Sequence, residues 1–120
     1  MKPLLAKDLA AFMLRFNNFK DGEFRSLEVI SPTTMKITLA GQDEARAFDW
    51  ISLELEFNGV NDAKLLESSK LHLVDMNDGI NIIYDKNFAF ALGEYNTLSS
   101  ITNSICYIVC TDIKYQEGKF

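Results

Sequence analysis

The chain has 120 residues, of which 48% are hydrophobic, and its 12 Lys and Arg against 17 Asp and Glu give a formal net charge of -5. This length and composition fit one folded domain over residues 1–120 and exclude a disordered or fibrous chain. The basic residues are scattered singly, so we expect no nucleic-acid partner, because phosphate binding requires a clustered Lys/Arg surface.

We expect no segment that enters a membrane or directs export. Lys7, Asp8 and Arg15 interrupt the first apolar run before the hydrophobic region of a signal peptide can form. No stretch of about 18 uncharged apolar residues follows, so no membrane-spanning segment is predicted. Cys106 and Cys110 fit the free thiols of a reducing compartment. The sequence therefore predicts a cytoplasmic protein.

The first predicted element is a helix from Pro3 to about Asn17. Pro3 suits a first helical turn, and the Asn, Asp and Gly residues between 17 and 22 supply the turn that follows. We expect Phe19 to fold back onto the apolar face of this helix. The residues of that face recur at helical offsets: Leu5, Leu9, Phe12, Met13 and Phe16.

After Gly22 the apolar residues alternate with polar ones, which predicts strands. Residues 61–67 are expected to form one capped helical turn, and residues 94–104 a surface segment or a short turn of helix. The segment 105–110 is apolar on both faces, which is typical of a strand covered on both sides. The expected strands are 25–29, 35–39, 50–57, 71–75, 80–84, 88–92 and 105–110, the last extended by Ile113 and Tyr115.

Short turns between these strands favour antiparallel pairing. The elements together predict an α+β fold, in which the N-terminal amphipathic helix packs on a mainly antiparallel, strongly curved sheet of about six to seven strands. The helix is expected to cover the sheet face that carries Met35, Ile37, Leu39, Ile51, Leu53 and Leu55.

Two acidic patterns resemble functional sites but have simpler explanations. The segment from Asp75 to Gly79 begins like a calcium loop, but Ile80 and Lys86 stand where that loop needs Gly and Glu, so a β-turn is favoured. Glu54 and Glu56 lie about 7 Å apart on one face of a strand, a spacing found in glycosidase carboxylate pairs. Nothing distinguishes the environments of these two carboxylates, so a solvated outer face is favoured.

The residue types for other chemistry are few. His72 is the only histidine, so a nucleophile and its base would have to be Cys106 or Cys110 with His72. A structural or surface histidine and buried thiols are favoured instead; in one strand the two cysteines would lie about 13 Å apart, too far for a disulfide. The six glycines are dispersed and form no phosphate loop. We expect no cofactor and no metal site.

Trp50 is the most informative single residue. The strand alternation places its side chain with Ser52, Glu54 and Glu56, opposite the core residues. A Trp beside carboxylates is typical of an interface, because Trp is enriched at binding hot spots and acidic neighbours steer a basic partner. The alternative is that Trp50 begins the strand and folds under the loop 42–46.

Two classes of function follow. The first is a small, acidic, cytoplasmic protein-binding module, such as an inhibitor or immunity-type partner of a basic protein, which binds through Trp50, Glu54 and Glu56. The second is a small-ligand-binding protein or an enzyme of unfamiliar type that uses a pocket in the curved sheet, although an enzyme is the less favoured hypothesis. Self-association through an exposed sheet edge is a further possibility.

Overall fold

The computed structural model describes the backbone of residues 1–120 and every side chain except those of Ser68 and His72. The strands form a five-stranded sheet A, ordered β1-β9-β4-β3-β2, and a four-stranded sheet B, ordered β5-β8-β7-β6. All neighbouring strands are antiparallel. In chain order the elements are β1 (Lys2–Leu4), η1 (Ala6–Asp8), α1 (Leu9–Arg15), η2 (Asn17–Phe19), β2 (Glu23–Ser31), β3 (Thr34–Asp43), η3 (Glu44–Arg46), β4 (Asp49–Asn58), β5 (Asp62–Lys64), η4 (Ser68–Leu73), β6 (Ile80–Asp85), β7 (Asn87–Leu92), α2 (Leu98–Ile101), β8 (Tyr107–Cys110) and β9 (Asp112–Lys119).

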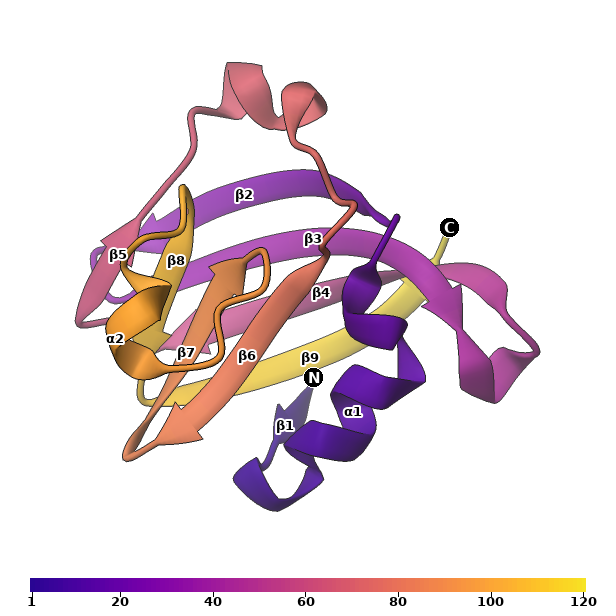
Figure 1. The fold of residues 1–120 in the computed structure, drawn as a ribbon, viewed down its shortest axis with the longest axis horizontal. Coiled ribbons are helices and arrows are strands. Elements are labelled where there is room, and N and C mark those ends of the chain that lie inside the picture. The colour runs from indigo at the N-terminus through magenta and orange to yellow at the C-terminus, as the bar shows by residue number, and fades with distance from the viewer.

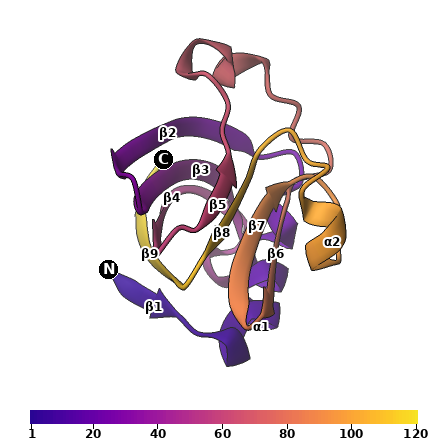
Figure 2. The same ribbon diagram turned by 90° about the vertical axis from the view of Figure 1, so that its left-hand side faces the viewer.

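The two sheets lie as separate layers with one apolar core between them (Figures 1 and 2). Helix α2 covers the outer side of sheet B, and α1 lies beside β6, on the side of sheet A that faces sheet B. The outer face of sheet A carries no helix (Figure 2). A smaller apolar cluster, which contains Ile101 of α2, lies on the outer side of sheet B. The largest fully buried side chains of the core between the sheets are Phe16, Phe19, Phe57, Phe90, Ile37, Leu39, Leu53, Leu55, Ile80, Ile108 and Ile113.

The predicted α+β class is confirmed, but the prediction of one strongly curved sheet of six to seven strands is wrong. The run 105–110 was expected to extend through Ile113 and Tyr115 as one strand. Instead the chain leaves sheet B after Cys110, and Ile113 and Tyr115 belong to β9 in sheet A. Strand β8 is apolar on both faces because one face meets the common core and the other meets α2.

The N-terminal helix is shorter than predicted. Pro3 lies in β1, an edge strand, where its missing N–H costs no sheet hydrogen bond on the open side. Leu5 is 45% exposed and does not belong to the buried face. The other four predicted face residues are buried, and Phe19 folds back as expected, with its ring stacked 4.8 Å from that of Phe16. Gly41 permits this packing, because a Cβ there would lie 2.8 Å from the Phe19 ring.

Two short segments differ from their predictions. Residues 62–64 form a strand, β5, instead of a helical turn, and the expected strand at 71–75 falls largely in the 3₁₀ helix η4. Residues 62–64 are few, so pairing with a distant strand outweighs their local pattern: β5 pairs with β8, which is more than 40 residues later. In the described backbone, residues 71–75 pair with no strand. The predicted turn of helix within 94–104 is confirmed as α2, whose Thr97 forms a capping box with Ser100.

The packing of α1 gives a direct test of the core. We expect Phe16→Ala to lower the free energy of unfolding by about 3–5 kcal/mol, since Phe16 is buried against Phe12 and Phe19 and its loss leaves a cavity. Leu14→Ala on the exposed face of the same helix is the matched control, with an expected change of within about 0.5 kcal/mol. Urea denaturation followed by circular dichroism measures both, and equal effects would contradict this placement of α1.

Candidate functional site

The outer face of sheet A is ordered in rows that run across its strands. The alternation predicted for β4 is confirmed, because Ile51, Leu53, Leu55 and Phe57 are buried and the intervening residues are not. The face changes along the strands from charged to aromatic. Its rows are Glu28, Lys36, Glu56 and Lys114; then Ser26, Thr38, Glu54 and Gln116; then Ala40, Ser52 and Gly118; and finally Trp50 beside Phe120.

Trp50 stands at the aromatic end of this face. It is 38% exposed, and its ring centroid lies 5.3 Å from that of Phe120. The Arg25 guanidinium lies 4.3 Å from the Phe120 ring centroid, and Nη1 of Arg25 donates to the Phe120 carbonyl oxygen at 3.2 Å. Residues from β2, β4 and the chain after β9 therefore form one aromatic and cationic cluster on the surface.

Glu54 and Glu56 lie on the outer face as predicted, but both have cationic neighbours. The Glu54 carboxylate is 3.9 Å from Nζ of Lys36. Glu56 pairs in register with Lys36 on one side and Lys114 on the other, and accepts a hydrogen bond from Asn58 at 3.1 Å. Opposite charges on neighbouring strands stabilise the sheet register. These carboxylates therefore contribute less negative charge to the surface than their sequence suggests.

A charged cluster joins α1 to the far end of sheet A. Nε and Nη2 of Arg15 each donate to the Asp43 carboxylate at 2.7 Å, a bidentate pair in which Asp43 is 0% exposed. Nη2 of Arg15 also lies 2.9 Å from Glu117, and Arg46 reaches both acids, at 3.4 Å from Asp43 and 2.6 Å from Glu117. Two arginines and two carboxylates thus form a network of ion pairs at the end of the core.

The cluster shifts the pKa values of its members. The hydrogen bond from Arg15 is the main reason that the pKa of Asp43 is lowered, despite burial, which acts in the opposite direction. Burial would by itself raise the pKa of Glu117, but the hydrogen bonds and charges of Arg15 and Arg46 together lower it. Both acids are therefore held ionised as counter-ions, so neither is suited to donate a proton near neutral pH.

Asp43 also shapes the loop that follows it. Its side chain accepts from the Ala45 N–H at 2.9 Å and so caps the short helix η3, while its carbonyl oxygen accepts from the Phe48 N–H at 2.9 Å. Ala47 and Phe48 adopt φ values of 54° and 65°, in the left-handed region that residues with a side chain rarely occupy. The loop 44–48 is therefore held in one uncommon conformation.

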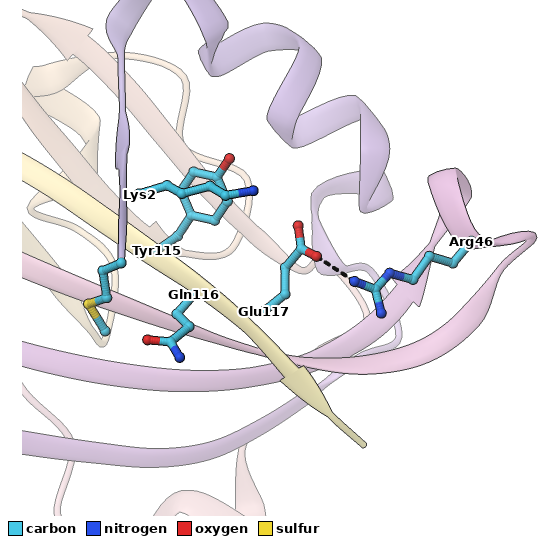
Figure 3. A pocket seen from close by; sticks show the side chains of 6 residues that line it. Lys2, Arg46, Tyr115, Gln116 and Glu117 are labelled. Carbon is cyan, nitrogen blue, oxygen red and sulfur yellow. Dashed lines mark hydrogen bonds and ion pairs between the residues drawn. The ribbon is translucent and has the colours of Figure 1, made fainter.

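Three grooves adjoin this loop. The first has a volume of about 330 Å³, and Trp50 and the exposed Phe48 lie on its wall together with Leu14 from α1. The second, of about 380 Å³, lies between β1 and η3 and is lined by Lys2, Tyr115 and the Arg46–Glu117 ion pair (Figure 3). The third, of about 410 Å³, lies on the other side of Trp50 and is lined by Trp50, Asp49, Lys119 and Phe120, among others. Since Glu117 is neutralised by two arginines, the second groove offers no carboxylate suited to acid or base catalysis.

The cysteines are not arranged as nucleophiles. Cys106 and Cys110 are free and fully buried. Burial raises the pKa of Cys106 to about 11 and that of Cys110 to about 12, so the reactive thiolate is scarce. His72, the only base that could have served them, lies outside the described side chains. The hypothesis of a cysteine–histidine pair therefore has no support from the thiols.

Comparison with protein-family models, with curated proteins and with solved structures returned no match for this chain. Among the described residues, no group of three or more His, Cys, Asp and Glu is placed to hold a metal ion. No helix in the described part of the chain has both the length and the apolar character needed to cross a bilayer. The candidate site therefore rests on the surface geometry alone.

Sequence reasoning found Trp50 but missed the residues that surround it. Phe48 and Leu14 lie outside the strand alternation; Phe48 is two residues before Trp50, whereas the nearness of Leu14 to Trp50 depends on how α1 packs. The Asp43 cap had a sequence signal, since Asp is favoured immediately before a helix. The 38% exposure of Trp50 and its contact with Phe120 favour an outward placement over the alternative in which Trp50 folds under the loop 42–46, although Gln42 and Glu44 of that loop lie in the same groove.

The charged cluster predicts a pH-dependent stability. Because the pKa of Asp43 is lowered on folding, its ionised form stabilises the fold above its ordinary pKa of 3.8, and this contribution is lost as pH falls further. Asp43→Asn should lower the free energy of unfolding at pH 7 by about 3 kcal/mol, since it leaves Arg15 without its buried partner. The variant should also lose less stability than the wild type between pH 5 and pH 2.

Denaturation of both proteins across that pH range measures this effect. Glu67→Gln is the control, because the pair of Glu67 with Lys70, at 3.9 Å, is exposed, so the substitution should change stability by less than about 0.5 kcal/mol. If Asp43→Asn and Glu67→Gln have the same small effect at pH 7, the Arg15–Asp43 pair does not stabilise this end of the sheet.

The thiols give a second test. Both cysteines should resist a disulfide reagent such as DTNB at pH 8 in the folded protein and react fully in denaturant, because each is buried and its pKa is raised. The release of thionitrobenzoate with time measures the reaction. Stoichiometric labelling of either thiol within seconds under native conditions would revive a nucleophilic role for that residue.

Proposed function

We propose that this chain is a small cytoplasmic protein-binding module that covers a basic protein with the outer face of sheet A. Trp50 is its anchor, and Glu54 and Glu56 are its charged neighbours. The observation that supports this most strongly is the 38% exposure of Trp50, next to Phe120, on a sheet face that no other element covers. Exposed aromatic residues of this kind are enriched at binding hot spots.

The net charge of the whole chain supports a basic partner over an acidic one, whereas the outer face of sheet A carries acidic and basic residues side by side. The net charge of -5 creates a field that speeds the approach of a positively charged protein. Glu54 and Glu56 are each beside Lys36, so their role in the proposed interface is to match individual charges of the partner. An inhibitor or immunity-type protein that covers a basic enzyme or toxin is a function of this kind.

The alternatives have less support. A small-ligand protein or enzyme would need converging polar groups that are not already paired, whereas Arg15, Arg46 and Glu117, which line the grooves beside η3, are engaged in ion pairs. Self-association through a sheet edge is opposed by the edges themselves. Strands β1 and β5 have three residues each, β6 is contacted by α1, and β2 has two register shifts and is contacted by η4.

A photo-crosslinking residue at Thr38, in the middle of the outer face, tests the proposal in the native host. We expect one basic protein to be recovered. With that partner purified, Trp50→Ser should speed its dissociation at least tenfold, and Glu54→Gln with Glu56→Gln should slow association and weaken its salt dependence. Glu67→Gln, an exposed acid outside sheet A, is the charge-matched control and should change neither rate appreciably.

Recovery of no protein from Thr38, or of an acidic one, would count against the proposal. So would a partner whose dissociation rate is the same for Trp50→Ser as for the wild type.

A further inference from the structure

The groove beside Trp50 is lined by large apolar side chains that are exposed to solvent. Leu14 is 73% exposed and Phe48 is 60% exposed, and both line the same groove of about 330 Å³ as Trp50. The three residues come from α1, the loop 44–48 and β4. Isolated exposed apolar residues are ordinary, but three that meet at one concave site are typical of a binding surface.

The backbone at Phe48 strengthens this interpretation. Ala47 and Phe48 are both left-handed, a conformation that Gly or Asn adopts at lower cost. Hydrogen bonds of Asp43 hold this conformation, because Asp43 accepts from the Ala45 and Phe48 N–H groups and from Arg15. Backbone strain of this kind persists only where the surrounding structure holds it, and strained residues cluster at functional sites.

The charges along the groove favour one kind of ligand. Its two bases are already engaged, Arg15 by Asp43 and Glu117, and Lys20 by Glu94 at 3.3 Å. Its acid, Glu44, forms no ion pair with any described side chain. The groove therefore combines an apolar wall with one carboxylate whose charge is not neutralised, which complements an apolar group next to a cation.

We propose that this groove binds a partner protein by taking one of its large apolar side chains between Leu14, Phe48 and Trp50, while an adjacent Lys or Arg of the partner pairs with Glu44. This rests on the proposed function, and it extends the interface of Trp50 around the end of strands β3 and β4 onto the loop 44–48. Phe48 is then a second anchor, held in place before the partner arrives, which reduces the entropy lost on binding.

Selection of a phage-displayed library of random 12-residue peptides against the purified protein tests the assignment without knowing the natural partner. We expect the enriched peptides to place Leu, Met, Phe or Trp next to Lys or Arg. Phe48→Gly should weaken their binding at least tenfold, because it removes the ring. Ala47→Gly relieves the same kind of backbone strain but keeps the ring, so it is the matched control and should bind within about threefold of the wild type.

Glu44→Gln should weaken only those peptides that carry the basic residue. Phe48→Gly is expected to fold, since Gly favours φ values near 65°, and its thermal unfolding midpoint verifies this. An absence of enriched peptides, or enrichment of acidic ones, would overturn the assignment.

Three other outcomes would show whether the groove assignment, the proposed function or both are wrong. Peptides that bind Phe48→Gly normally but lose binding to Trp50→Ser would overturn the groove and leave the proposed function standing. Peptides insensitive to both variants would contradict both proposals. If sedimentation equilibrium shows a dimer that Phe48→Gly dissociates, the occupant is a second copy of the chain and the assignment to a different, basic partner is wrong.

Discussion

The inner face of sheet A is longer than sheet B can cover, so another part of the chain must bury the apolar residues that sheet B leaves uncovered. Strands β3 and β4 each have ten residues, whereas β6 and β7 have six and β8 has four. Helix α1 and the turn after it supply the missing layer with the rings of Phe12, Phe16 and Phe19. The bidentate Arg15–Asp43 pair then fastens the end of this layer to the end of β3.

The Arg15–Asp43 pair contributes both to stability and to the conformation of the candidate site. Asp43 is one of the two polar residues that are buried in the described part of the chain, and it holds Arg15 with its carboxylate while it shapes the loop 44–48. The left-handed conformation of Phe48 is thus maintained by the same residue that closes the core. On this account the surface around Trp50 is rigid because its support belongs to the fold, which is the arrangement that favours tight and specific protein binding.

Much of sheet A could be predicted from the sequence, because the alternation along β3 and β4 is long enough to define a buried and an exposed face. The division into two sheets could not, since β8 and β9 are separated by one residue and no local pattern marks a change of layer. Trp50 was predicted to face outward by that alternation. Its neighbours Leu14, Phe48 and Phe120 depend on long-range packing and on positive φ values, for which Phe gives no sequence signal.

The most direct test of this account is the hydrogen exchange rate of the Phe48 amide, which donates to the Asp43 carbonyl oxygen at 2.9 Å. In the wild type this amide should be clearly protected, although its side chain is exposed. Arg15→Met should remove that protection while leaving the amide of Leu55, in the middle of sheet A, protected as before. A Phe48 amide that exchanges at the unprotected rate in the wild type would contradict the claim that the core holds this loop ready for binding.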